Sequence, residues 1–136
     1  MSLPRTINAR SYYRCAIQRY QESVVLLQVG YTTGALYLAG YGIECALKAL
    51  LLHATPEAER GDLIPFRGHQ GHDLEWLRSQ YLRTGASLPG HMARLFALVN
   101  TWSTEFRYSP KRVPDSEADA FLKATESILE WMKGRF

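Results

Sequence analysis

The sequence has 136 residues, a length typical of one domain and short for two independent ones. We therefore treat residues 1–136 as a single domain. A formal charge of +3 is small for a strong nucleic-acid binder, and charges of both signs spread along the chain argue against wholesale disorder. Two cysteines are too few for the disulfide framework of a small secreted protein, so we expect both to be reduced.

The first ten residues, MSLPRTINAR, lack the apolar core of a signal peptide. We therefore expect a cytoplasmic protein.

Hydrophobic spacing predicts a first amphipathic helix over about Asn8–Val29, which Gly30 ends. After a short connection, in which Thr32 or Thr33 is expected to be the cap, a second helix is predicted over about Gly34–His53. The short connection predicts an antiparallel hairpin. The second helix is apolar nearly all round, which indicates a central position, and a stripe of small residues would let a neighbour approach closely: Ala35, Ala39, Gly42, Ala46 and Ala49.

The second helix is also long enough to suggest a membrane span. Glu44 and Lys48 lie near its middle, where charges are unfavourable in hydrocarbon. We therefore expect no membrane association.

Residues 54–71 contain two prolines, three glycines and many charges, which predicts one long irregular connection. Asp73 is a plausible N-cap for a third, shorter helix that ends near Gly85.

A fourth helix is predicted over about Leu88–Trp102. The prolines of Ser103–Pro114 break the pattern, and a last amphipathic helix runs from about Asp115 to the C-terminus. The predicted fold class is all-α, an antiparallel up-and-down bundle of about five helices.

A polar stripe lies on the otherwise apolar second helix. Tyr37, Tyr41, Glu44 and Lys48 follow steps of four, three and four residues, which places them on one face. One interpretation is a partly exposed Glu44–Lys48 pair. The other is a Glu44 held inside the bundle to orient a cation such as Arg107, since a buried carboxylate needs a partner.

His69, His72 and Asp73 have a spacing that metal ligands can adopt, but no second ligand pair accompanies them. A helix start at Asp73 explains the pattern more simply. We predict no metal and no cofactor.

The segment TWSTEFRYSPKR mixes aromatic and basic residues, a combination that stacks bases and neutralises phosphate. The same composition also describes a loop whose aromatic side chains plug one end of the bundle. The aromatic and basic residues of this segment are Trp102, Phe106, Arg107, Tyr108, Lys111 and Arg112.

Taken in order, AGYGIECALKALL, GHDLEWL and FRYSP ahead of a final amphipathic helix resemble a prokaryotic HEPN (higher-eukaryote and prokaryote nucleotide-binding) domain. The resemblance covers nearly the whole chain. It implies an antiparallel helical bundle that is commonly a homodimer. Many members are RNA-cleaving toxins or effectors, and others are nucleotide-binding or partner modules beside small nucleotidyltransferases.

Nuclease members of this superfamily carry an R-x4-6-H motif, which here would begin at Arg107. Positions 112–114, where the histidine should stand, hold Arg, Val and Pro, so the motif is broken and the usual acid/base partner is missing. Arg67 and His72 satisfy R-x4-H, but they lie in the long connection, and we interpret that match as chance.

The resemblance and the residues together favour a homodimeric binding or partner module that holds a nucleotide or RNA phosphate. It would be part of a toxin–antitoxin-like pair with a small nucleotidyltransferase. Its expected ligand residues are Arg107, Tyr108, Lys111, Trp102 and Lys48.

Two alternatives stay open. The first is a divergent metal-independent ribonuclease in which His72 and Arg107 are catalytic, although the broken motif weighs against an enzyme. The second is a structural or dimerisation domain without a ligand, in which Glu44, His72 and Arg107, with the neighbouring Asp73, form a polar network.

Overall fold

The structure is a computed structural model that describes residues 6–62, 66 and 68–136, without the side chains at positions 62, 104 and 107. This part of the chain is helical and contains no strand, which confirms the predicted all-α class. Its five α-helices and three short 3-10 helices are α1 (Ile7–Gln28), α2 (Thr32–Ala54), η1 (Glu57–Asp62), η2 (His69–His72), α3 (Leu74–Arg83), α4 (Gly90–Val99), η3 (Thr104–Tyr108) and α5 (Asp115–Lys133).

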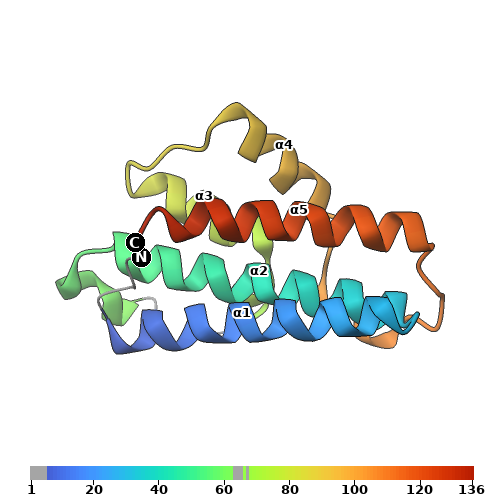
Figure 1. The fold of residues 1–136 in the computed structure, drawn as a ribbon. Coiled ribbons are helices and arrows are strands. Elements are labelled where there is room, and N and C mark those ends of the chain that lie inside the picture. The colour runs from blue at the N-terminus through green and yellow to red at the C-terminus, as the bar shows by residue number, and fades with distance from the viewer. Residues whose placement is uncertain (1–5, 63–65, 67) are drawn as a thin grey trace.

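Helices α1 and α2 form the predicted antiparallel hairpin (Figure 1). Gly30 lies between them at a φ of +91°, a conformation that side-chain-bearing residues rarely adopt. The two helices approach closely at Gly42, where an added Cβ would lie 3.1 Å from the Ala16 carbonyl oxygen. The small-residue stripe of α2 therefore does allow the close contact that the sequence indicates.

The predicted cap of α2 is wrong. The helix begins at Thr32, so Thr32 and Thr33 lie inside its first turn, and the N-cap residue Tyr31 makes no side-chain cap hydrogen bond. The two threonine hydroxyls donate instead to the carbonyl oxygens of Val113 and Lys111, at 2.6 and 3.0 Å. They hold the segment before α5 against the start of α2.

Helix α2 is the centre of the bundle, in contact with α1, α3 and α5, while α4 packs on α5. Helices α2 and α5 run side by side in the same direction (Figure 1). By length and hydropathy α2 could span a membrane, but 83% of its most apolar 18-residue stretch is buried inside the protein. Packing accounts for its apolar surface.

The fourth helix is shorter than predicted and ends at Val99. The three residues after it turn the chain so that the Trp102 side chain reaches α2, where it is 4% exposed. Trp102 therefore belongs to the core and not to the helix.

Candidate functional site

A buried ion pair lies in the polar stripe of α2. Lys48 Nζ is 2.8 Å from Glu44 Oε2, and the two side chains are only 7% and 1% exposed. Solvent therefore screens this pair far less than it screens a surface pair. The pair that the spacing suggests is present, but it is buried and not partly exposed, because neighbouring side chains from outside α2 cover it.

His72 brings the connection between α2 and α3 to the same carboxylate. Its Nδ1 lies 3.2 Å from Glu44 Oε1 and 3.3 Å from Oε2, and its side chain is 49% exposed. A carboxylate that accepts the Nδ1 proton fixes the tautomer and the orientation of the ring. Nε2 is then the ring nitrogen that can act on another group.

Asp73, next to His72, caps a helix. Its Oδ1 accepts the backbone N–H groups of Glu75 and Trp76, at 3.0 and 3.3 Å, and so caps α3 as predicted. This places Asp73 in helix capping, and the polar network consists of Glu44, Lys48 and His72.

Two aromatic rings that the sequence did not single out cover Lys48. Lys48 Nζ lies 5.7 Å from the centre of the Tyr12 ring and 5.2 Å from that of Phe66, within the range of cation–π attraction. The rings meet edge to face at 5.7 Å. Burial, with smaller contributions from Cys45 and Glu44, raises the pKa of Tyr12. We call Tyr12, Glu44, Lys48, Phe66 and His72, from α1, α2 and the following connection, the Glu44 cluster.

The local signal for these rings is weak. Tyr12 lies outside the apolar stripe of α1, and Phe66 lies in a connection without hydrophobic periodicity. Only the tertiary arrangement reveals them.

The segment before η3 is anchored to the same stripe of α2. The Trp102 indole donates to the Tyr37 carbonyl oxygen at 3.0 Å and stacks on the Tyr37 ring at 5.8 Å. It also covers Gly40, where an added Cβ would lie 2.1 Å from the indole. Trp102, expected to bind a ligand, is therefore occupied by packing.

The residues that follow face outward. Tyr108 is 76% exposed and Lys111 is exposed, while Phe106 is partly buried against the core. The Lys111 backbone is fixed by the hydroxyl of Thr33. Of the expected ligand residues, Tyr108 and Lys111 are thus on the surface, whereas Lys48 is buried in the Glu44 cluster.

The η3 helix and the Glu44 cluster lie over neighbouring parts of one helix face. Tyr37, which anchors the η3 segment, precedes Glu44 by seven residues, which is about 10 Å along an α-helix. Arg107 belongs to η3, but its side chain lies outside the described part of the structure. Arg67, the arginine of the second motif match, lies outside the described residues too.

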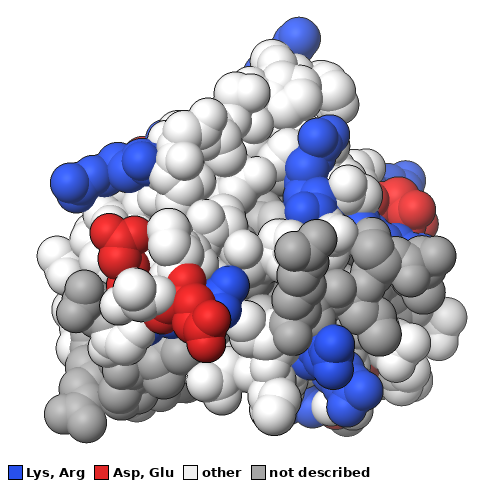
Figure 2. Space-filling view, turned by 90° about the vertical axis from the view of Figure 1, so that its left-hand side faces the viewer, with Lys and Arg blue, Asp and Glu red and all other residues white. Residues whose placement is uncertain are grey.

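Among the residues that the structure describes, the charged side chains do not form one positive face at the end of the bundle that holds the termini. Figure 2 shows Lys and Arg there in several separated groups, with Asp and Glu gathered nearby. Within the described residues, no three His, Cys, Asp or Glu side chains are grouped as a metal site would need.

Comparison with known proteins gives one family. A sequence model described as the HEPN domain matches residues 9–135. Among solved structures, TT1696 from Thermus thermophilus superposes with a TM-score of 0.72 at 17% identity, over 96% of this chain and 100% of that one. ST0689, an archaeal HEPN homologue, gives 0.61 at 20% identity, over 95% and 98%. Both likenesses concern the fold. A comparison with curated proteins found no match.

Proposed function

The chain belongs to the HEPN domain family, and from that membership we propose that it is a binding module for the phosphate of a nucleotide or a single-stranded RNA. The ligand would lie against the exposed Tyr108 and Lys111, with Arg107 as the further ligand residue that the sequence suggests, and we call these three residues the η3 surface. This proposal keeps three of the ligand residues that the sequence suggests and leaves out the buried Trp102 and Lys48.

The observation that carries the proposal is that one aromatic side chain near η3 is buried while another is exposed. Trp102 is 4% exposed and fixes the segment to α2, while Tyr108 is 76% exposed. An exposed ring on an anchored turn loses little conformational freedom when a base stacks on it. Lys111, three residues after Tyr108, supplies a cation for the phosphate.

A mild overall charge suits this kind of site. Binding that depends on one stacking ring and two cations should be modest in affinity and strongly weakened by salt. It would not need the broad positive face of a general RNA binder.

The test is a fluorescence anisotropy titration with a fluorescein-labelled single-stranded RNA of twelve nucleotides, repeated with labelled ATP. Tyr108→Ala should weaken RNA binding by roughly 5- to 150-fold, because one base stack contributes about 1–3 kcal/mol. Tyr108→Phe keeps the ring and should bind as wild type.

Lys111→Ala should make the negative slope of log affinity against log salt shallower by about 0.7, the value for one phosphate contact on a single strand. The matched control is Lys123→Ala, which removes an exposed cation paired with Asp119 on α5 and should leave the slope unchanged. The proposal fails if neither RNA nor ATP binds, or if Tyr108→Ala binds both as wild type does.

The geometry of His72 supports a second candidate, a divergent ribonuclease. An acid/base histidine needs a defined tautomer and access to substrate. His72 has Nδ1 against Glu44 and a side chain that is 49% exposed. The test is cleavage of single-stranded RNA in EDTA. Loss of activity in His72→Ala would support this candidate, and activity that is unchanged in that variant would exclude it.

The expected partners are part of the proposal as well. From the family resemblance we propose a homodimer and a small nucleotidyltransferase as protein partner. Light scattering on the purified chain tests the dimer: a mass of twice 15.5 kDa supports it and a mass of 15.5 kDa excludes it.

A further inference from the structure

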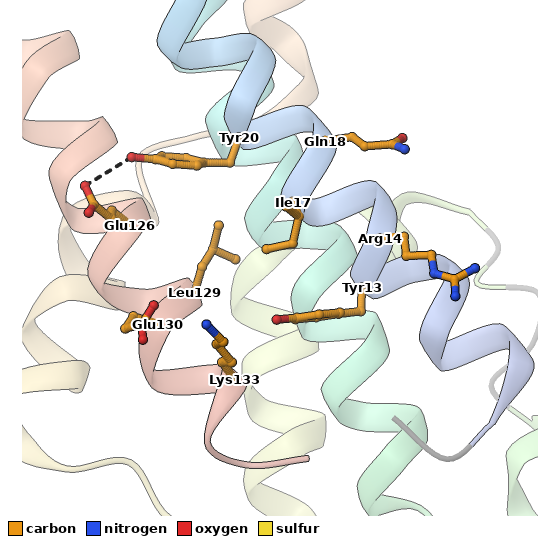
Figure 3. Close-up of a pocket in the computed structure, with 9 residues that line it drawn as sticks. All are labelled: Tyr13, Arg14, Ile17, Gln18, Tyr20, Glu126, Leu129, Glu130 and Lys133. Atoms are coloured by element: carbon orange, nitrogen blue, oxygen red, sulfur yellow. Dashed lines mark hydrogen bonds between the residues drawn. The ribbon is translucent and has the colours of Figure 1, made fainter. Parts of the chain in front are cut away.

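A cleft of about 590 Å³ lies between α1 and α5, apart from the Glu44 cluster and the η3 surface. Its two ends are marked by tyrosines of α1. Tyr13 and Tyr20 are two helical turns apart, and Figure 3 shows both rings extending toward α5. Between them, Ile17 from α1 and Leu129 from α5 form an apolar floor.

The α5 wall of the cleft is acidic. Glu126 and Glu130 are one turn apart and line the cleft, and the Tyr20 hydroxyl donates to Glu126 Oε2 at 3.2 Å (Figure 3). Burial, with a further contribution from Glu126, raises the pKa of Tyr20 to about 12. The phenol therefore keeps its proton at neutral pH, and the carboxylate keeps further lone pairs for another donor.

Two cations also line the cleft, but only one enters the charge balance. The Arg14 side chain extends away from α5 (Figure 3). Lys133 lies on the α5 side with the two glutamates. Two carboxylates and one ammonium leave the α5 wall with one net negative charge.

These features match a ligand site in size and chemistry. Small-molecule clefts usually enclose about 300–1,000 Å³, with apolar and aromatic lining and a few polar groups that fix orientation. The partly exposed Tyr20 ring can attract a cation over its face, while Tyr13 is buried against Phe136 and closes the other end of the cleft. Carboxylates pair with ammonium and guanidinium groups. With Lys133 offsetting one of the two carboxylates, the α5 wall keeps one net negative charge, which disfavours an anion.

We propose that the α1/α5 cleft binds a small organic cation, an amine with an apolar or aromatic body. The amine would lie between the Glu126 and Glu130 carboxylates, and the body would cover Ile17 and Leu129 between the two tyrosine rings. The proposal does not depend on the η3 surface, because none of the cleft residues belongs to that surface.

The test uses three probes that share one phenyl body: 2-phenylethylamine, 2-phenylethanol and 3-phenylpropionate. Each is titrated into the ¹⁵N-labelled full chain at pH 7 and followed by ¹H–¹⁵N spectra. The amine should give saturable shifts in residues 13–20 and 126–133. The alcohol should bind at least several-fold more weakly, and the propionate should bind most weakly of the three.

Glu126→Gln and Glu130→Gln should each weaken amine binding by roughly two- to five-fold, the effect of a solvent-accessible ion pair. Both glutamates are exposed, so these variants should keep the fold. Glu117→Gln, an exposed acid in the first turn of α5 that does not line the cleft, is the matched control and should bind as wild type. Equal binding of the amine and the propionate, no saturable shift with the amine, or unchanged affinity in both glutamine variants would each overturn the proposal.

Discussion

Removing one partner of the buried Glu44–Lys48 pair should destabilise the domain strongly. The two side chains are 1% and 7% exposed, and their charged atoms lie 2.8 Å apart. Glu44→Leu would leave the Lys48 ammonium inside the bundle beside the Tyr12 and Phe66 rings, without its carboxylate partner. Breaking a buried pair in this way typically costs about 3–5 kcal/mol, a large part of the stability of a domain of this size.

A double variant separates the contribution of the ion pair to the unfolding free energy from the cost of leaving one charge buried and unpaired. Glu44→Leu with Lys48→Met replaces both charges by apolar groups, and such replacements are often close to neutral. His72 would lose its carboxylate, but its side chain is 49% exposed and water can hydrate it. We therefore expect the double variant to be more stable than Glu44→Leu alone.

Guanidinium unfolding followed by circular dichroism measures these differences. The matched control is the exposed Asp119–Lys123 pair on α5, which has the same spacing, a distance of 2.9 Å and side chains 51% and 75% exposed. Asp119→Ala should change the unfolding free energy by less than about 0.5 kcal/mol. Losses in Glu44→Leu as small as in this control, or a double variant that is no more stable than Glu44→Leu, would contradict the prediction.

Three further predictions concern packing and titration. Gly40→Ala should lower the unfolding free energy by at least about 2 kcal/mol, because the new Cβ would lie 2.1 Å from the Trp102 indole. At the control position Gly34 the nearest atom to an added Cβ is 3.5 Å away, so Gly34→Ala should be neutral or stabilising. Burial, with a smaller contribution from Glu44, raises the pKa of the Cys45 thiol to about 12. At pH 8 a thiol-reactive dye should therefore modify at most the partly exposed Cys15 in the folded chain, and both thiols in guanidinium. Rapid modification of both thiols without denaturant would be inconsistent with the burial of Cys45. Because the pKa of Tyr20 is raised from 10.0 to about 12, the contribution of its protonated hydroxyl to stability is present below pH 10 and lost as the pH rises toward 12. The unfolding free energy of Tyr20→Phe should therefore fall less steeply with pH over this interval than that of the wild type. The same pH dependence in both proteins would rule out a raised Tyr20 pKa.

The sequence predicts the helices well where the hydrophobic period is long. The extents of α1 and α2 agree with the prediction within about two residues at each end, because both patterns run for five or more turns. The end of the fourth helix could not be predicted in the same way. Trp102 continues the helical spacing, and its contacts with Tyr37 and Gly40 on another helix take it out of the pattern.

The site is less predictable than the fold. The spacing of Glu44 and Lys48 places them on one face, but it does not tell whether that face is covered. Their cover comes from Tyr12 and from the connection that carries Phe66, and those contacts depend on tertiary structure. His72 could be named from the sequence, but its contact with Glu44 spans 28 residues and has no local signal.

Composition alone also does not separate inward from outward aromatic residues. Trp102 and Tyr108 lie in one short segment rich in basic residues, and both were expected at a ligand site. Their exposures of 4% and 76% assign them to opposite sides of the segment. The difference arises because Trp102 has an acceptor on α2, the Tyr37 carbonyl oxygen, that its indole N–H can reach.

The proposed phosphate-binding role of the η3 surface is best tested by the affinity of the labelled twelve-nucleotide RNA for wild type, Arg107→Ala and the control Lys123→Ala in one titration at low salt. Circular dichroism on the same samples checks that each variant is folded. We predict that Arg107→Ala is folded and binds roughly tenfold or more weakly, since a charge-assisted contact contributes about 1.5–3 kcal/mol, while Lys123→Ala binds as wild type. RNA binding by folded Arg107→Ala that equals wild type would contradict the proposed role.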